Sequence, residues 1–205
     1  MQLQELVKNI QFKGTPDNRE ISSITYDSRK VKPGTLFVAI SGMQTDGHEF
    51  IPQAIENGAV AILSNGRSPK TKAVPILQVK DPRLAMSQIS AQFYGNPSAK
   101  INIVGITGTN GKTSITHILH HILQTSGAAC GTLGTLGFQT PSGMVSTGFT
   151  TPESVELQQM LQTLTLAGVD NLVMEISSHA LDLHRVDDVE VDIAVFSNLT
   201  PEHLD

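Results

Sequence analysis

Apolar residues along this chain alternate between short runs of strand length and longer amphipathic stretches with helical spacing. In the first part of the chain, strand-length runs lie at residues 35–40, 59–63 and 74–79. Amphipathic stretches lie at 48–57 and 83–93. The cluster Tyr94-Gly95-Asn96-Pro97-Ser98 cannot continue the second of these helices. This alternation predicts a small α/β domain over residues 1–97.

A second set of alternating segments begins at residue 98 and runs to residue 205. Strand-length runs are predicted at 101–106, 171–176 and 192–196. Helices are predicted from about 112 to 124 and from Pro152-Glu153 to Gly168, and residues 131–138 are a glycine-rich strand or loop. Because strands alternate with helices, the fold class is α/β, with a parallel sheet in this second domain.

The amino-acid composition argues against a nucleic-acid-binding protein and against a membrane protein. The 205 residues are 39% hydrophobic and 16% charged, with a formal net charge of -5 and 4% aromatics. Without a run of Lys or Arg, nucleic acid is not an expected partner. No apolar segment approaches the roughly 18 residues that a membrane span needs, so membrane insertion is not expected. The single cysteine, Cys130, agrees with a reducing compartment, and we expect a cytoplasmic protein.

The strongest chemical signal is the stretch Gly105-Ile106-Thr107-Gly108-Thr109-Asn110-Gly111-Lys112-Thr113, between a predicted strand and a helix start. Glycines allow successive backbone N–H groups to face one anion, and a lysine at this position can reach terminal phosphates. The Thr113 hydroxyl is then placed to bind Mg²⁺. The match to the strict phosphate-loop pattern is imperfect, because Ile106 stands where that pattern has glycine.

A nucleotide site also needs a carboxylate to hold the metal ion, and Glu175 is the candidate. It interrupts an apolar strand-length run, where an unpaired buried acid would be unfavourable. The alternative is a glutamate at a strand edge that faces solvent. The polar residues Ser177-Ser178-His179 follow at the same strand end and favour the first interpretation.

Other polar residues carry weaker signals. His117, His120 and His121 have helical spacing, but no carboxylate accompanies them, so we interpret them as helix surface or packing. Asp27-Ser28-Arg29 is either a capped turn or part of a polar ligand site. His184-Arg185 could meet an anionic substrate. No Gly-x-Ser-x-Gly elbow is present to support a hydrolase.

The stretch from Gly108 to Thr113 resembles the ATP loop of the Mur ligases and of folylpolyglutamate synthetases. Further stretches make the chain similar to the MurE-type members of the Mur ligase family. They are Asp27-Ser28-Arg29, residues 34–39, Thr150-Thr151-Pro152-Glu153, residues 174–181 and residues 198–205. The resemblance covers essentially the whole chain. It implies a small N-terminal uridine-nucleotide domain, followed by a truncated ATP-binding domain with a parallel sheet of the P-loop type.

The resemblance also implies an activity. The chain would take part in the ATP- and Mg²⁺-dependent addition of the third amino acid to UDP-N-acetylmuramoyl-L-alanyl-D-glutamate, through an acyl phosphate, in peptidoglycan synthesis. The added residue would be meso-diaminopimelate, the commoner choice of the family, or L-lysine. Alternatives are another Mur ligase, a folylpolyglutamate-type ligase, or a non-catalytic nucleotide-binding module. The hundred or so residues before Lys112 favour the uridine-nucleotide domain of a Mur ligase over a folate ligase.

By resemblance, the chain's residues take three roles. The ATP-binding residues would be Gly108, Thr109, Asn110, Gly111, Lys112, Thr113 and Ser114. The catalytic residues would be Lys112, Glu175 and His203, and the metal ligands Thr113, Glu175 and His203. The substrate-binding residues would be Ser28, Met43, Gln44, Thr45, Thr150, Thr151, Ser177 and Arg185.

Two departures from the family pattern affect these expectations. Leu183 stands where the family often has a substrate-binding glutamine, so that side-chain hydrogen bond is not expected. The family has three domains, and its carbamylated lysine and its C-terminal domain, which selects the third amino acid, would lie beyond Asp205. We therefore expect no turnover by this chain alone. Release of ADP that depends on the UDP-linked dipeptide and an added amino acid would contradict that expectation.

Overall fold

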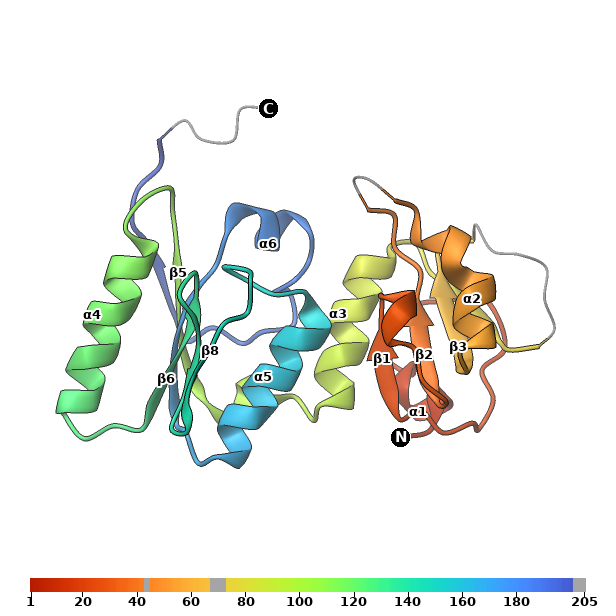
Figure 1. Ribbon diagram of the computed structural model, residues 1–205, viewed down its shortest axis with the longest axis horizontal. Helices are drawn as coiled ribbons and strands as arrows, with labels where there is room; N and C mark the ends of the chain where they lie inside the picture. The colour runs from red at the N-terminus through yellow and green to blue at the C-terminus, as the bar shows by residue number, and fades with distance from the viewer. Residues whose placement is uncertain (43–44, 67–72, 201–205) are drawn as a thin grey trace. The chain divides into compact units, whose positions relative to one another are not determined.

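The computed structural model describes residues 1–42, 45–66 and 73–200. The chain folds into two compact units, Met1–Phe93 and Tyr94–Asp205 (Figure 1). This division lies directly before the Tyr94-to-Ser98 cluster, four residues before the boundary expected after residue 97. Each unit has its own sheet.

The first unit is built on a parallel four-stranded sheet in the order β1-β2-β3-β4. Its strands are β1 (Ser23–Thr25), β2 (Thr35–Val38), β3 (Ala59–Ser64) and β4 (Ile76–Gln78). Its helices are α1 (Leu3–Leu6), α2 (Ile51–Glu56) and α3 (Pro82–Phe93), with single 3₁₀ turns η1 (Ser28–Lys30) and η2 (Gly47–Phe50). The strands predicted from apolar runs are therefore present, and β2 is buried along its whole length.

The helix predicted over residues 48–57 is divided into the 3₁₀ turn η2 and the α-helix α2. The Asp46 carboxylate accepts a hydrogen bond from the His48 N–H at 3.1 Å and begins the 3₁₀ turn. Pro52 lies in the first turn of α2, where a missing N–H removes no helical hydrogen bond. Ile51 then packs with Phe37, Ile62 and other apolar side chains in the core between the helix and the sheet.

The second unit contains a six-stranded sheet in the order β10-β5-β9-β6-β7-β8. The strands are β5 (Asn102–Thr107), β6 (Cys130–Gly134), β7 (Gly137–Thr140), β8 (Gly143–Val145), β9 (Asn171–Glu175) and β10 (Ile193–Phe196). The first four strands in this order are parallel, as predicted. The glycine-rich stretch 131–138 forms β6 and the start of β7, and β7 and β8 extend the sheet as antiparallel strands.

Helices pack against this sheet with apolar side chains. They are α4 (Lys112–Thr125), α5 (Ser154–Leu166) and the short α6 (Ser178–Asp182), with the 3₁₀ turn η3 (Pro97–Lys100) before β5. Leu157, Leu161 and Leu164 of α5 join Leu172 and Met174 of β9 in one core cluster. Among the described residues, no helix is long and apolar enough to cross a membrane.

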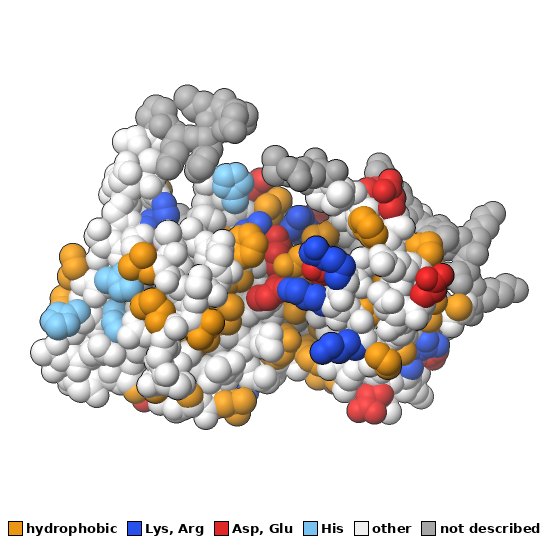
Figure 2. Space-filling view, in the orientation of Figure 1, with side chains coloured by type: hydrophobic (Ala, Val, Ile, Leu, Met, Phe, Trp, Pro, Cys, Tyr) orange, Lys and Arg blue, Asp and Glu red, His pale blue; other side chains and the backbone are white. Residues whose placement is uncertain are grey.

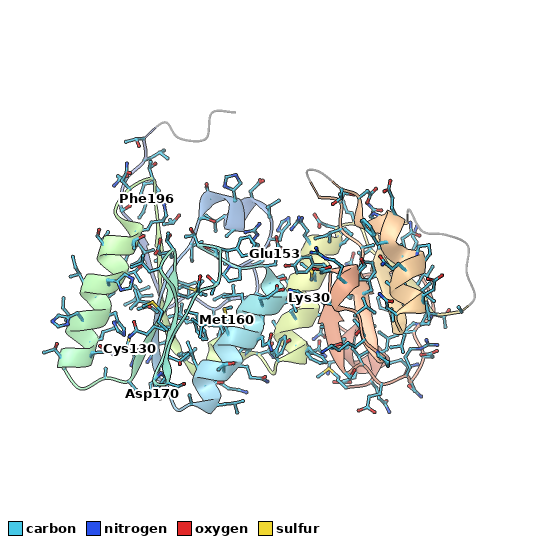
Figure 3. All side chains as sticks on the ribbon, viewed as in Figure 1. Lys30, Cys130, Glu153, Met160, Asp170 and Phe196 are labelled. Atoms are coloured by element: carbon cyan, nitrogen blue, oxygen red, sulfur yellow. The ribbon has the colours of Figure 1, made fainter. Side chains whose placement is uncertain are left out.

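Strand β10 is largely exposed. The apolar run at 192–196 forms a strand, yet Ile193 and Phe196 are 58% and 64% exposed. The reason is position, because β10 pairs with β5 on one side and is the edge strand of the described sheet. Figure 3 shows Phe196 and Asp170 toward opposite ends of this unit.

The three histidines of α4 divide by exposure. His120 is buried and its Nε2 lies 3.2 Å from the carbonyl oxygen of Cys130, whereas His121 is exposed. Histidine and apolar side chains lie side by side on the surface of α4 (Figure 2). The described residues contain no group of three or more His, Cys, Asp or Glu side chains arranged to hold a metal ion. The burial of His120 and the exposure of His121 agree with the predicted roles, packing and helix surface.

Stability is expected to fall in mild acid because of His120. Burial holds the pKa of His120 below its ordinary value of 6.5. As pH falls, His120 is therefore protonated in the unfolded chain at a higher pH than in the folded protein. The free energy of unfolding is unaffected by this histidine above about pH 6.5 and decreases as pH falls below that value. The free energy of unfolding in urea should drop between pH 7.5 and 5.5, and drop less in His120→Gln. The control is the exposed His121→Gln. The charge of His121 lowers the pKa of His120 less than burial does, so the drop in this variant should stay close to that of the unsubstituted protein. An equal drop in all three proteins would contradict the assignment.

The thiol of Cys130 is expected to react very slowly in the folded protein. Cys130 begins β6, where it packs with Ile106 and Val173, and burial raises its pKa to about 11 (Figure 3). The thiolate is the reactive form, and a pKa about two units above 9.0 lowers its population roughly 100-fold. Labelling with a disulfide reagent at pH 8 should be at least that much slower in the native protein than in denaturant. Equal rates would show that the thiol is accessible and ionised.

Candidate active site

The glycine-rich loop connects the carboxyl end of β5 to the start of α4. Gly108 and Gly111 have φ angles of 129° and 89°, a region that residues with a Cβ rarely adopt, and Gly111 is the N-cap of α4. The N–H groups of Lys112, Thr113 and Ser114 lie in the first helical turn and have no partner within the helix. Together with the helix dipole, these N–H groups form an environment that favours an anion.

The segment after β10 holds the loop in shape. The Asn198 carbonyl accepts from the Thr109 N–H, and the Asn198 side-chain oxygen accepts from the Asn110 N–H, both at 3.0 Å. Ser197 and Asn198 side chains both donate to the Asn110 carbonyl, at 2.8 and 2.9 Å. These bonds join two segments about 90 residues apart in the chain, so the loop conformation depends on the pairing of β10 with β5 in the folded sheet.

The Lys112 ammonium lies over the same loop. Its Nζ donates to the carbonyl of Gly108 at 2.5 Å and to that of Thr109 at 3.1 Å. The positive charge is thereby held beside the unpaired N–H groups at the start of α4. A terminal phosphate placed at this helix start would meet both the ammonium and the backbone donors.

Glu175, at the end of β9, is paired within the unit rather than facing solvent. Its side chain is buried, with the residue 1% exposed. Its Oε2 accepts from the Thr113 hydroxyl at 3.0 Å and from the Thr135 hydroxyl at 3.1 Å, and its Oε1 accepts from the Thr135 N–H at 3.0 Å. Of the two interpretations that the sequence left open for Glu175, the structure therefore supports the buried, paired carboxylate.

Gly134 makes room for this carboxylate. Gly134 ends β6, the neighbour of β9 in the sheet, and a Cβ at this position would lie 2.2 Å from Glu175 Oε1. The next residue, Thr135, supplies two of the three donors to Glu175. Sequence reasoning did not identify either residue, because both lie in the glycine-rich stretch 131–138 and neither carries a charge.

A cavity of about 860 Å³ opens beside the loop and the carboxylate. Residues of the loop, of the β6–β7 turn, and of the segments after β9 and β10 line it. They are Thr107, Gly108, Thr109, Asn110, Gly111, Lys112, Thr113, Ser114, Thr135, Thr150, Glu175, Ser177, Ser178, His179, Leu181, Phe196, Leu199 and Thr200. The volume is within the range that small-molecule sites occupy.

The oxygen atoms beside this cavity fit a magnesium ion. Mg²⁺ binds oxygen ligands at about 2.0–2.1 Å in an octahedron, so adjacent ligands lie about 3 Å apart. Thr113 Oγ1 and Glu175 Oε2 are 3.0 Å apart. One hydroxyl and one carboxylate are typical of a site that Mg²⁺ shares with phosphate oxygens and water. His203, the third predicted ligand, lies outside the described residues.

The other residues predicted in this unit take different positions. Thr150 lines the cavity, and its hydroxyl oxygen lies 3.1 Å from that of Thr135. Thr151 is buried, and its hydroxyl donates to the Glu175 carbonyl at 3.0 Å and accepts from the Ser177 N–H at 3.1 Å. Ser177 also caps α6, because its hydroxyl oxygen accepts from the Ala180 N–H.

Arg185 is engaged inside the same unit. Its guanidinium donates to the Thr151 carbonyl at 3.0 Å and forms an ion pair with Glu153 at 2.9 Å, and both side chains are largely buried. Figure 3 labels Glu153 near the start of α5. Thr151 therefore connects the end of β9 to the segment before α5, and Arg185 connects the residues after α6 to that same segment.

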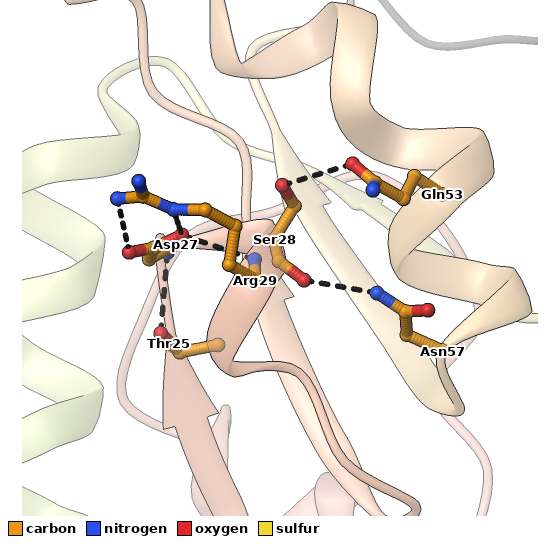
Figure 4. Close-up of polar contacts among 6 residues, drawn as sticks. All are labelled: Thr25, Asp27, Ser28, Arg29, Gln53 and Asn57. Carbon is orange, nitrogen blue, oxygen red and sulfur yellow. Dashed lines mark hydrogen bonds and ion pairs between the residues drawn. The ribbon is translucent and has the colours of Figure 1, made fainter.

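Of the substrate-binding residues predicted in the first unit, Ser28 lies in η1, shortly after the end of β1. The Ser28 hydroxyl donates to the Gln53 side chain at 3.2 Å, and the Asn57 amide donates to the Ser28 carbonyl at 3.1 Å (Figure 4). The hydrogen bond from Arg29 holds the pKa of Asp27 below its usual value. Thr45 is exposed, and Met43 and Gln44 lie outside the described residues.

Comparison with known proteins places both units in one family. Residues 20–94 match the model described as Mur ligase family, catalytic domain, and residues 106–205 match the Mur ligase middle domain. The chain is 45% identical over 207 residues to the UDP-N-acetylmuramoyl-L-alanyl-D-glutamate--2,6-diaminopimelate ligase of Caldanaerobacter subterraneus subsp. tengcongensis, covering 100% of this chain and 43% of that protein. It is 46% identical over 187 residues to the ligase of the same name from Geobacter sulfurreducens, covering 91% of this chain and 37% of that protein.

A solved structure of a UDP-N-acetylmuramoyl-L-alanyl-D-glutamate--2,6-diaminopimelate ligase has the same fold. Its TM-score is 0.84 at 27% identity, and the match covers 100% of this chain and 42% of that chain. The chain thus spans about two fifths of the length of the proteins it matches. Two family models matching in succession, with relatives above 40% identity along the chain, show that it belongs to the Mur ligase family.

Proposed function

We propose that this chain forms the nucleotide- and precursor-binding part of an ATP-dependent ligase. The ligase would join meso-diaminopimelate to UDP-N-acetylmuramoyl-L-alanyl-D-glutamate in peptidoglycan synthesis. The observation that carries the proposal is the contact between Glu175 and Thr113 beside the glycine-rich loop, which brings a carboxylate to the start of α4. The names of the relatives at 45% and 46% identity support the choice of substrate and of diaminopimelate.

The proposed reaction begins with transfer of the γ-phosphoryl group of ATP to the D-glutamate carboxylate of the precursor. The acyl phosphate is then attacked by the amine of the third amino acid, and phosphate leaves as the amide bond forms. Negative charge on the transferring group is stabilised by the Lys112 ammonium and by the N–H groups of the first turn of α4. Mg²⁺, when bound by Thr113 and Glu175, supplies further charge neutralisation for the phosphate oxygens.

Direct binding measurements test this proposal on the chain as it stands. Calorimetry should show that MgATP binds and that Lys112→Ala weakens binding about 100-fold, since the ammonium contacts the site directly. Lys100→Ala is a matched control, because Lys100 lies in η3 and does not line the cavity. Absence of MgATP binding by the unsubstituted chain would overturn the proposal.

Thermal shifts distinguish the remaining functions. A ligand that binds only the native state raises the melting temperature with its concentration. We expect stabilisation by UDP-N-acetylmuramoyl-L-alanyl-D-glutamate and none by folates. Stabilisation by ATP alone would favour a non-catalytic nucleotide-binding module, and stabilisation by folates a folylpolyglutamate-type ligase.

A further inference from the structure

The Thr135 side chain lies between the buried carboxylate and the cavity. Thr135 itself is exposed and lines the cavity, whereas Glu175 is 1% exposed. Its hydroxyl donates to Glu175 Oε2 at 3.1 Å, and its backbone N–H donates to Oε1 at 3.0 Å. Both carboxylate oxygens are therefore held from one residue, which restricts rotation of the carboxylate about its terminal bond.

The same hydroxyl is also hydrogen-bonded to a second residue that lines the cavity. Thr135 Oγ1 lies 3.1 Å from Thr150 Oγ1. A threonine hydroxyl has one proton. Because Thr135 gives its proton to Glu175, the proton between the two threonines comes from Thr150. The order of donation is Thr150 to Thr135 to Glu175, and it runs from the cavity wall to the carboxylate.

We propose that Thr135 is a positioning residue for the metal-binding carboxylate, holding Glu175 Oε2 at the 3.0 Å spacing from Thr113 Oγ1 that a magnesium ion requires. This inference rests on the proposed function, because it assigns the site to a Mg²⁺–nucleotide complex. Residues that hydrogen-bond to a metal ligand commonly affect metal affinity by about 10- to 100-fold when they are replaced. Thr135 acts through Glu175, and its own side chain need not touch the metal ion.

The hydroxyl can be removed without disturbing the backbone donor. Thr135→Val keeps the size and the N–H bond to Oε1 but removes the bond to Oε2. Thr135→Ser restores a hydroxyl. Thr140→Val is the matched control, because Thr140 lies in β7 with hydroxyl contacts to Ser142 and Gly143 and does not line the cavity.

The experiment is a titration of Mg²⁺ at fixed ATP, with nucleotide affinity measured by calorimetry for each variant and melting temperature measured without metal. Mg²⁺ increases the affinity for ATP, and Thr135→Val should need about 10-fold more Mg²⁺ to reach half of that increase. Thr135→Ser and Thr140→Val should need about as much Mg²⁺ as the unsubstituted protein. A normal Mg²⁺ requirement in Thr135→Val overturns the inference while leaving the proposed function intact. If the ATP affinity of the unsubstituted chain does not depend on Mg²⁺, both the inference about Thr135 and the proposed function are overturned. A loss in Thr135→Val that Thr135→Ser fails to rescue also overturns the role given to the hydroxyl.

Discussion

Gly134→Ala is expected to abolish the Mg²⁺-dependent part of nucleotide binding and to destabilise the fold. The new Cβ would lie 2.2 Å from Glu175 Oε1, and 2.7 and 2.8 Å from the next two carbon atoms of that side chain. Glu175 is buried between β6 and its hydrogen-bond partners, so it must leave the position beside Thr113. Overpacking of this kind typically destabilises a protein by about 1–3 kcal/mol. Calorimetry with and without Mg²⁺, together with urea unfolding, measures both effects.

The matched control for this substitution is Gly127→Ala. Gly127 has a φ of 87° and nothing within 4 Å of an added Cβ, so alanine there introduces backbone strain without a clash. A residue forced into this conformation is destabilised by about 1–2 kcal/mol. The two variants should therefore have comparable stabilities but different responses to Mg²⁺. Normal Mg²⁺-dependent binding in Gly134→Ala would show that the carboxylate does not need its present position.

Glu175→Gln is expected to remove the benefit of Mg²⁺ while largely preserving the fold. Glutamine has the same shape, but it lacks the negative charge that attracts a divalent cation. Oε2 accepts from the hydroxyls of Thr113 and Thr135, and Oε1 accepts from the Thr135 N–H, so the new amide group faces at least one donor in either position. The lost hydrogen bond should lower the free energy of unfolding by about 1 kcal/mol.

Measurements of nucleotide affinity distinguish the effect of removing the Glu175 charge from the effect of lower stability. In Glu175→Gln, saturating Mg²⁺ should leave ATP affinity close to its value without metal, a loss of about 100-fold or more relative to the unsubstituted chain. Glu190→Gln removes the same charge at an exposed position outside the cavity and should leave binding unchanged. If Glu175→Gln bound MgATP as tightly as the control, the carboxylate would have no role in holding the metal.

Local patterns along the chain predicted most of the secondary structure. The apolar runs at 59–63, 101–106 and 171–176 correspond to β3, β5 and β9 within a residue or two at each end. Strand alternation and short apolar runs reflect burial within a few residues, so they can be recognised without knowledge of distant contacts. The phosphate-binding loop was also visible, because its glycines and lysine are consecutive and their chemistry depends on a strand-to-helix turn.

Other features depend on residues far apart in the chain. The division of residues 48–57 into η2 and α2 is an exception, because its cause is local: Asp46 caps η2, a detail that helical periodicity does not show. The exposure of β10 follows from its place at the sheet edge. Likewise, the buried position of Thr151 and the ion pair of Arg185 with Glu153 required the packed unit.

The order of residues was therefore enough to define an α/β chain, a loop suited to phosphate and an acidic candidate at 175. Whether that acid faced solvent or the loop was settled by folding, because β6 and β9 pair across about 40 residues and bring Thr135 to Glu175. Periodicity indicates which side chains are buried, but not which buried side chains contact one another. Those contacts depend on the order of the strands, which is a property of the assembled sheet.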